Sequence, residues 1–369
     1  MTHVSRRNPL RRIGLFALIV AVQFALFEAA LRTWGSSEAA PAFQGLFADD
    51  PVVGYRLKPG ARTRFTTSEF DTELAVNASG VRDDEAIGPK APDERRILLL
   101  GDSLVLAVQV PFRQTFGELL EQRLNSRGSR VHYRVINAGV QGYGPVQELL
   151  LCRSLLPVVK PDLIIDTLFV GNDIEDAVSG QALLEGRQRA ISVREATTMR
   201  LRRLVRRSMV LQVFRVRALT ATGRFTRTAA PPEPPLQSYA SDPAPRIAQG
   251  LSIIHRVVQQ IDQEGRASGA RTAVMLMPAR FQVNDEDYGH LRDAVSQAGG
   301  ILVRDAAGER IDGALRDLPV PRFDALPALR AAGADAFFLH TVHLTPRGHE
   351  VVAAALERFL RESRLLDGF

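Results

Sequence analysis

A short apolar run that stops abruptly at a glycine is the feature that most constrains this chain. Ile97 to Leu100 are consecutive apolar residues, as in a strand that is buried on both faces of a parallel sheet. Gly101 allows a sharp turn, and Asp102 and Ser103 are favourable residues for the start of a helix. The stretch therefore predicts a strand, a turn and a helix, with a serine at the strand's carboxyl end, where open α/β sheets bind their ligands.

Strands and helices alternate from there to the end of the chain and predict a doubly wound α/β fold. Right-handed connections between parallel strands put helices on both faces, so we expect a five-stranded parallel sheet in three α/β/α layers. The predicted strands are 96–100, 131–137, 163–170, 272–277 and 301–303. The predicted helices are 115–125, 145–156, 247–264, 288–297 and a last one from Thr345-Pro346 to about residue 362.

The N-terminus carries a membrane-targeting pattern. Four arginines between residues 6 and 12 precede an apolar stretch at 13–27 that only Gln23 interrupts. The stretch is either a signal anchor that stays in the membrane as a helix or a signal peptide that is removed. We expect the anchor, because no small-residue cleavage site follows directly. The arginines would stay in the cytoplasm, which puts the rest of the chain on the periplasmic side of a bacterial inner membrane, or secretes it after cleavage.

Composition divides the chain into three parts. Residues 1–34 form the expected membrane segment, 35–94 a tether with a small β-rich lead-in, and 95–369 the sheet domain. An arginine- and proline-rich insertion at about 185–246 interrupts the sheet domain, because α/β elements resume after it.

The positive charge of the chain is concentrated in that insertion. Between Arg187 and Arg227 there are twelve arginines and one glutamate, against a net charge of +6 for the whole chain. The remainder is therefore net negative, and we expect no nucleic-acid partner. Residues 198–219 have apolar side chains at helical spacing opposite arginines. This pattern predicts a surface helix packed on the core, or a helix that rests on anionic lipid headgroups.

Four loops carry residues that suit chemistry. Ser103, Gly142 and Asn172 follow the first three predicted strands, and His343 precedes the last helix. The carboxyl ends of parallel strands meet at one edge of a sheet, so these loops can converge. Acyl transfer by serine needs a nucleophile, a base in contact with it and donors for the oxyanion. Ser103 supplies the hydroxyl and His343 the base. The amides of Ser103 and Gly142 and the side chain of Asn172 supply three donors.

In this order the motifs resemble those of the SGNH branch of the GDSL esterase/lipase superfamily, in its membrane-tethered bacterial form. The matching blocks are Gly-Asp-Ser-Leu at 101–104, Asn-x-x-x-x-Gly at 137–142, Gly-Asn-Asp at 171–173 and His-Leu-Thr-x-x-Gly-His at 343–349. The resemblance implies that Ser103 is the nucleophile, that His343 is the base and that Gly142 and Asn172 complete an oxyanion hole. It implies no metal or organic cofactor, and the single cysteine, Cys152, excludes an internal disulfide.

The acid that usually orients the histidine is missing from its place. The family has an aspartate two or three residues before the histidine, where this chain has Thr341 and His340. Asp335, eight residues upstream, is the remaining candidate for an orienting acid. The sequence leaves three alternatives: a Ser-His dyad oriented by a backbone carbonyl, a displaced acid, or a pseudo-enzyme.

We expect a serine esterase acting on acyl esters, such as O-acyl groups of cell-envelope glycans or lipids. The same site suits an acyltransferase, and the missing aspartate suits a non-catalytic protein that binds acylated glycans. The expected partners are the acyl-ester substrate and the membrane, through the segment at 13–27 and the helix at 198–219.

Overall fold

The computed structural model describes residues 23, 43, 45–126, 131–186 and 236–367. The predicted membrane segment and the predicted arginine-rich helix lie outside the described residues, apart from the isolated Gln23. Among the residues that are described, no helix combines the length and the apolar character that a membrane crossing requires.

The predicted five-stranded parallel sheet is confirmed. Its order is β6-β5-β7-β8-β9, and every neighbouring pair is parallel. The strands are β5 (Glu94–Gly101), β6 (His132–Gly139), β7 (Leu163–Phe169), β8 (Arg271–Met277) and β9 (Arg322–Asp324). The strand order reverses between β5 and β7, and doubly wound sheets bind ligands outside the carboxyl ends of the strands at such a point. Ser103 follows β5, and Asn172 follows β7.

The predicted fifth strand at 301–303 is wrong. Leu302 makes only an isolated antiparallel bridge with Ala240, and the side chains of Ile301 and Val303 are exposed. The fifth strand is β9, whose buried Phe323 pairs with Met275 of β8. Three residues are too few to show a strand periodicity, so the apolar run at 301–303 was the stronger signal in the sequence.

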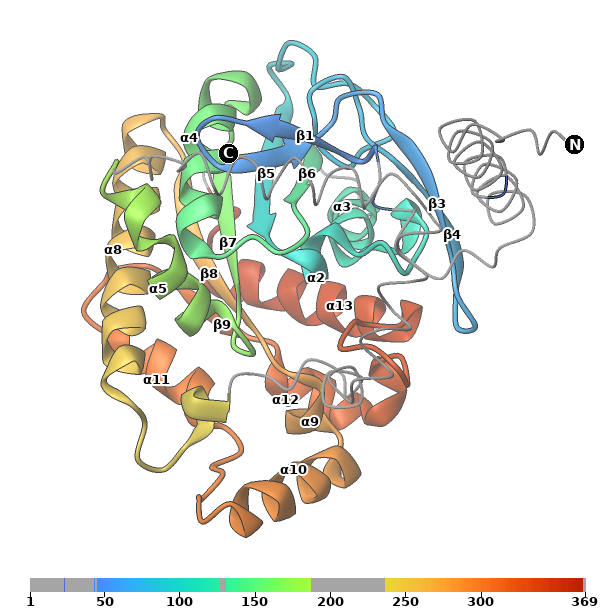
Figure 1. Cartoon of the computed structure of the whole chain (residues 1–369). Helices are drawn as coiled ribbons and strands as arrows, with labels where there is room; N and C mark the ends of the chain where they lie inside the picture. The colour runs from blue at the N-terminus through green and yellow to red at the C-terminus, as the bar shows by residue number, and fades with distance from the viewer. Residues whose placement is uncertain (1–22, 24–42, 44, 127–130, 187–235, 368–369) are drawn as a thin grey trace, which may run out of the picture. The chain divides into compact units, whose positions relative to one another are not determined.

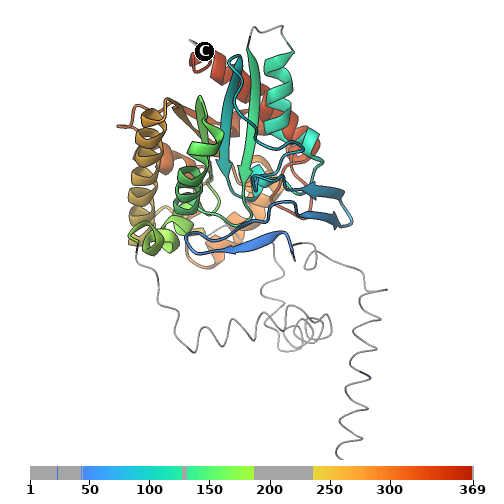
Figure 2. The ribbon, with the colours of Figure 1, turned by 90° about the horizontal axis from the view of Figure 1, so that it is seen from above.

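Helices cover both faces of the sheet, which confirms the three layers (Figures 1 and 2). On one face α4 (Pro145–Val159), α5 (Asp173–Leu184) and α8 (Pro245–Ala267) pack against one another. On the other face α3 (Phe116–Asn125) packs against α13 (Pro346–Glu362). The buried side of α13 contains Val352, Leu356 and Leu360 at helical spacing, as the sequence pattern predicts.

Short elements follow the carboxyl ends of several strands. The four-residue helix α2 (Ser103–Leu106) follows β5, and α9 (Arg280–Val283) follows β8. The remaining helices are α10 (Asp285–Gln297), α11 (Ala306–Ala314), α12 (Leu326–Ala332) and the 3-10 turns η1 (Phe112–Gln114), η2 (Leu236–Tyr239) and η3 (Ala334–Ala336).

The lead-in forms two antiparallel hairpins that are bound to the sheet's loops. Strand β1 (Phe47–Asp50) pairs with β2 (Gly54–Leu57), and β3 (Arg62–Thr66) pairs with β4 (Asp71–Ala75). The Tyr55 hydroxyl donates to the carbonyl of Gln141 at 2.8 Å, and the Thr72 hydroxyl donates to the carbonyl of Val108. The described lead-in and sheet therefore form one compact unit, and the lead-in contacts the loops after β5 and β6.

Candidate active site

Ser103 lies at the sharp turn where β5 becomes α2. A Cβ atom at Gly101 would stand 2.3 Å from Cγ2 of Val105, so the turn requires glycine. The Asp102 carboxylate caps α2 and accepts from the Leu104 amide at 2.8 Å. Together these residues hold the Ser103 side chain, which is 9% exposed, at the carboxyl edge of the sheet.

His343 comes from the loop before α13 and reaches the serine across the chain. Its Nε2 lies 3.0 Å from Oγ of Ser103, although 240 positions separate the two residues. The loop is fixed by its own backbone, since the His343 amide donates to Thr341 Oγ1 and its carbonyl accepts from the Phe338 amide. A hydroxyl and an imidazole at this distance have the geometry that a nucleophile and its general base require.

The loop that carries His343 is clamped from both sides. The Glu69 carboxylate, in the turn between β3 and β4, accepts from the amides of Leu339 and His340. The Arg280 guanidinium of α9 donates to the carbonyls of Phe338 and Leu339. Because Glu69 and Arg280 both bind residues 338–340, just before His343, the position of the imidazole depends on the lead-in as well as on the sheet domain.

The second ring nitrogen of His343, Nδ1, has no partner among the described residues. Nδ1 is buried and makes no hydrogen bond within the described part of the chain. Asp335 is exposed, and its backbone carbonyl, not its carboxylate, accepts from the Thr345 hydroxyl. The structure thus brings His343 to Ser103 but brings neither the Asp335 carboxylate nor a backbone carbonyl to Nδ1.

Burial sets the protonation state of both histidines of the His-Leu-Thr-x-x-Gly-His block. It lowers the pKa of His343 from 6.5 to about 4, so the imidazole is neutral at pH 7 and can accept a proton. The pKa of His349 falls to about 3, and its Nδ1 accepts from the Phe116 amide at 3.2 Å. His349 therefore joins α13 to α3 and takes a structural role.

Gly142 and Asn172 lie in the loops after the two strands that flank β5. Gly142 has a φ of +72°, and a Cβ there would come within 3.2 Å of the Tyr55 hydroxyl, so a larger residue would strain the loop. Asn172 caps α5, and its Nδ2 donates to the Asp176 carboxylate at 2.6 Å. The amide group carries two N–H bonds, so one is left for a ligand.

Buried carboxyl groups lie behind the site, and the sequence analysis did not single them out as a group. Glu148 of α4 and Asp166 of β7 are fully buried, and burial raises the pKa of both, that of Asp166 to about 7. Asp173 is also fully buried, and its raised pKa has burial and the nearby Asp102 carboxylate as its main causes. Burial likewise raises the pKa of Asp102 to about 6, against the amides of Leu104 and Ser103, which lower it. These buried carboxyl groups near Ser103 therefore bind a proton at higher pH than exposed carboxyl groups do.

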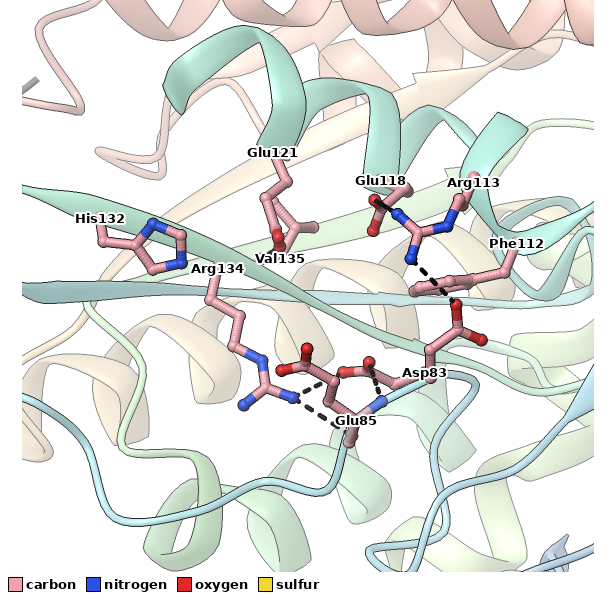
Figure 3. Close-up of a pocket in the computed structure, with 10 residues that line it drawn as sticks. Asp83, Glu85, Phe112, Arg113, Glu118, Glu121, His132, Arg134 and Val135 are labelled. Atoms are coloured by element: carbon pink, nitrogen blue, oxygen red, sulfur yellow. Dashed lines mark hydrogen bonds and ion pairs between the residues drawn. The ribbon is translucent and has the colours of Figure 1, made fainter. Parts of the chain in front are cut away.

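Cavities at the outer edge of the sheet and at the carboxyl ends of its strands open on the described surface. One of about 220 Å³ lies at the outer edge of the sheet, where Glu121 of α3 and Arg134 of β6 point into the same space (Figure 3). Its lining includes the first half of β6, at the opposite end of that strand from the loop that carries Gly142. The other, of about 410 Å³, is lined by Val170, Pro278 and Asp324 at the carboxyl ends of β7, β8 and β9, on the same edge as Asn172. Among the described residues no cluster of His, Cys, Asp or Glu could hold a metal ion.

Comparison with known proteins gives likeness only at the level of structure. No family model matches the sequence, and no curated protein is similar to it. The crystal structure of TesA is 16% identical in sequence and has a TM-score of 0.41. The match covers 73% of this chain and 99% of TesA. The esterase EstA from Pseudoalteromonas sp. is 11% identical, with 73% and 98% covered and a TM-score of 0.41. A member of the lipolytic G-D-S-L family from Veillonella parvula is 14% identical, with 72% and 99% covered and a TM-score of 0.38.

At these low scores the function has to be inferred from the chain's own residues. The five parallel strands and the turn after β5 are those that the sequence predicts. The loops with the Gly-Asp-Ser, Asn-x-x-x-x-Gly and Gly-Asn-Asp blocks all leave the carboxyl edge of the sheet. The chain thus has a three-layer α/β/α fold in which these motif loops leave one edge of the sheet.

Proposed function

We propose that this protein is a serine esterase of the SGNH type. The observation that carries the proposal is the hydrogen bond of 3.0 Å between His343 Nε2 and Ser103 Oγ. A neutral imidazole in contact with a buried hydroxyl can remove its proton as the oxygen attacks. The lowered pKa of His343 keeps the ring in this neutral form at pH 7.

The reaction then runs in two halves. Ser103 Oγ bonds to the acyl carbon while its proton passes to His343 Nε2. The bond from the acyl carbon to the alcohol oxygen breaks, and the alcohol leaves with that proton. Water next attacks the acyl-serine, gives a proton to His343, and releases the acid as Ser103 Oγ takes the proton back. The developing oxyanion would be bound by the amides of Ser103 and Gly142 and by Nδ2 of Asn172.

The substrate class we propose is an O-acyl group on a cell-envelope glycan or lipid. Its support is the N-terminal pattern at 13–27, which predicts that the sheet domain faces the periplasm. If a sugar hydroxyl replaces water in the second half, the same residues perform acyl transfer.

A second function, binding of an acylated glycan without turnover, has one observation in its favour. Nδ1 of His343 lacks the partner that usually stabilises the imidazolium formed during attack. Loss of the orienting aspartate of a serine protease lowers kcat by about 10⁴-fold. On this reading Ser103 and His343 hold the ester but do not cleave it.

Covalent labelling separates the two functions. The full-length protein is treated with a fluorophosphonate, and the modified peptide is identified by mass spectrometry. The esterase proposal expects phosphonylation of Ser103 that disappears in Ser103→Ala and His343→Ala. Ser238→Ala is a matched control, because Ser238 is also buried and donates to a carboxylate, that of Glu175 at 2.7 Å. An unlabelled Ser103 in a folded protein that binds acetylated glycan would favour the binding function.

A further inference from the structure

The nucleophile stands on a helix that is too short to be stable by itself. Helix α2 has only four residues, from Ser103 to Leu106, and all four are buried. A single helical turn fixes several residues for one or two internal hydrogen bonds. Its last carbonyl groups have no partner inside the helix, and buried carbonyls without partners are costly. The chain must therefore satisfy the end of α2 from outside.

Arg82 of the lead-in binds the last carbonyl of α2 and two carbonyls beyond it. Its Nη1 donates to the carbonyls of Leu106 at 2.5 Å and Ala107 at 2.6 Å, and its Nη2 donates to that of Val110 at 2.7 Å. Ala107 has a left-handed conformation with a φ of +53°, which a residue with a Cβ adopts only when its surroundings hold it. The guanidinium thus binds three carbonyl groups in the segment 106–110, where the helix that carries Ser103 ends.

Two further side chains complete the binding of this segment. Asn137 of β6 donates from Nδ2 to the carbonyl of Val105 at 2.7 Å, and the Thr72 hydroxyl of β4 donates to that of Val108. Thr72 and Arg82 both belong to the lead-in, so most of these donors come from outside the sheet domain.

Arg82 has no competing partner. It is 1% exposed, and within the described residues no ion pair joins it to a carboxylate. Burial lowers the pKa of Arg82 to about 10, so the group is still charged at neutral pH. The three carbonyl dipoles and the charge of the Asp84 carboxylate stabilise this buried guanidinium. The guanidinium and the 106–110 segment therefore fix each other.

We propose that Arg82 is a positioning residue for Ser103: by binding the carbonyls of Leu106, Ala107 and Val110, it holds α2 so that Ser103 Oγ meets His343. The proposal rests on the proposed esterase function. It makes the lead-in a component of the active site through its hydrogen bonds to the segment after Ser103.

The test compares two buried arginines on the full-length protein. Arg96 is also 1% exposed, and it donates to the carbonyls of Val159 and Gly88 at the opposite end of β5. Arg82→Met, Arg82→Lys and Arg96→Met are measured for Tm, for kcat and KM on p-nitrophenyl acetate, and for the rate of fluorophosphonate labelling. All rates are taken well below the Tm of each variant.

For Arg82→Met we expect kcat and the labelling rate to fall by about 10- to 100-fold with KM within about twofold, because misplacement of a reacting group by about 1 Å costs up to about 10²-fold. Lysine keeps the charge but lacks the planar fork, so Arg82→Lys should recover part of the loss. Arg96→Met should lower the Tm and leave kcat within about twofold of wild type.

Equal kcat in folded Arg82→Met and wild type would overturn the proposal, and so would an equal loss of kcat in Arg96→Met. If the Arg82 variants do not fold, Thr72→Val removes one donor of the same segment with little change of shape. A fall of a few-fold in kcat at constant KM then supports the proposal, and an unchanged kcat overturns it. A wild type that neither turns over nor labels refutes the esterase function instead, and the proposal for Arg82 falls with it.

Discussion

The two nitrogens of the His343 ring have opposite environments: Nε2 lies 3.0 Å from Ser103 Oγ, while Nδ1 is buried without a partner in the described chain. The ring can thus accept the serine proton, but no acid helps to stabilise the imidazolium. Its orientation comes instead from the loop, whose amides and carbonyls are bound by Glu69 and Arg280. This arrangement differs from a serine-protease triad, and it leads to distinct predictions.

Asp335 should be dispensable for turnover. Its carboxylate is exposed and makes no hydrogen bond with His343 in the described structure, so Asp335→Asn should keep kcat/KM on p-nitrophenyl acetate within about twofold of wild type. Glu362→Gln, a neutralising change at the far end of α13, is the control for the change in charge. A loss approaching the ~10⁴-fold of a protease that lacks its aspartate would show that Asp335 orients the ring after all.

The pH profile should begin at unusually low pH. Only neutral His343 accepts the serine proton, and burial lowers its pKa to about 4. We therefore expect kcat/KM to rise with pH through about 4 and not through the 6.5 of a free imidazole. Circular dichroism shows over which pH range the chain is folded.

Asp102 is the other titrating group beside Ser103, with a pKa of about 6. A limb near pH 6 that disappears in Asp102→Asn would belong to that carboxyl. A limb at 6.5 to 7 that remains in Asp102→Asn would contradict the burial of the His343 ring.

Removing one buried carboxyl should stabilise the fold at high pH. Burial raises the pKa of Asp166 from 3.8 to about 7 in the folded chain. The favourable contribution of Asp166 to the free energy of unfolding is therefore complete below the pKa of the unfolded chain. That contribution is lost as pH rises through the pKa of the folded chain. Asp166→Asn should have a Tm above that of wild type at pH 8, by roughly 5 °C, and a smaller difference at pH 5. Asp293→Asn, on the exposed side of α10, should show no such pH dependence. A Tm of Asp166→Asn below that of wild type at pH 8 would contradict the prediction that removing this carboxyl stabilises the fold.

Sequence patterns were informative where local chemistry determines structure. The apolar run before Gly101 predicted β5 and its turn, because a strand buried on both faces has few polar residues. The last helix was predicted from Pro346 onward, and Thr345 does cap it by accepting from the Gly348 amide. β9 was missed because its three residues depend on pairing with β8, which no local pattern records.

The features that depend on distant contacts could not be predicted. Arg82 stands in a polar loop of the lead-in, and its partners are carbonyls 24 to 28 positions away, which leave no trace in side-chain patterns. Asp166 interrupts an otherwise apolar strand, and this was the one sequence signal for the buried carboxyl groups. A carboxylate in a buried strand requires a neighbouring group that alters its ionisation. The missing acid near His343 was visible, but the clamp by Glu69 and Arg280 was not.

Turnover of p-nitrophenyl acetate by purified wild type, Ser103→Ala and His343→Ala tests the central claim most directly. We predict measurable kcat for wild type and a loss of at least about 10³-fold in each variant. The double variant should be no worse than either single change, because the two residues act as one unit. Wild-type turnover that survives Ser103→Ala, or a folded wild type without turnover above the variants, would contradict a Ser103–His343 esterase.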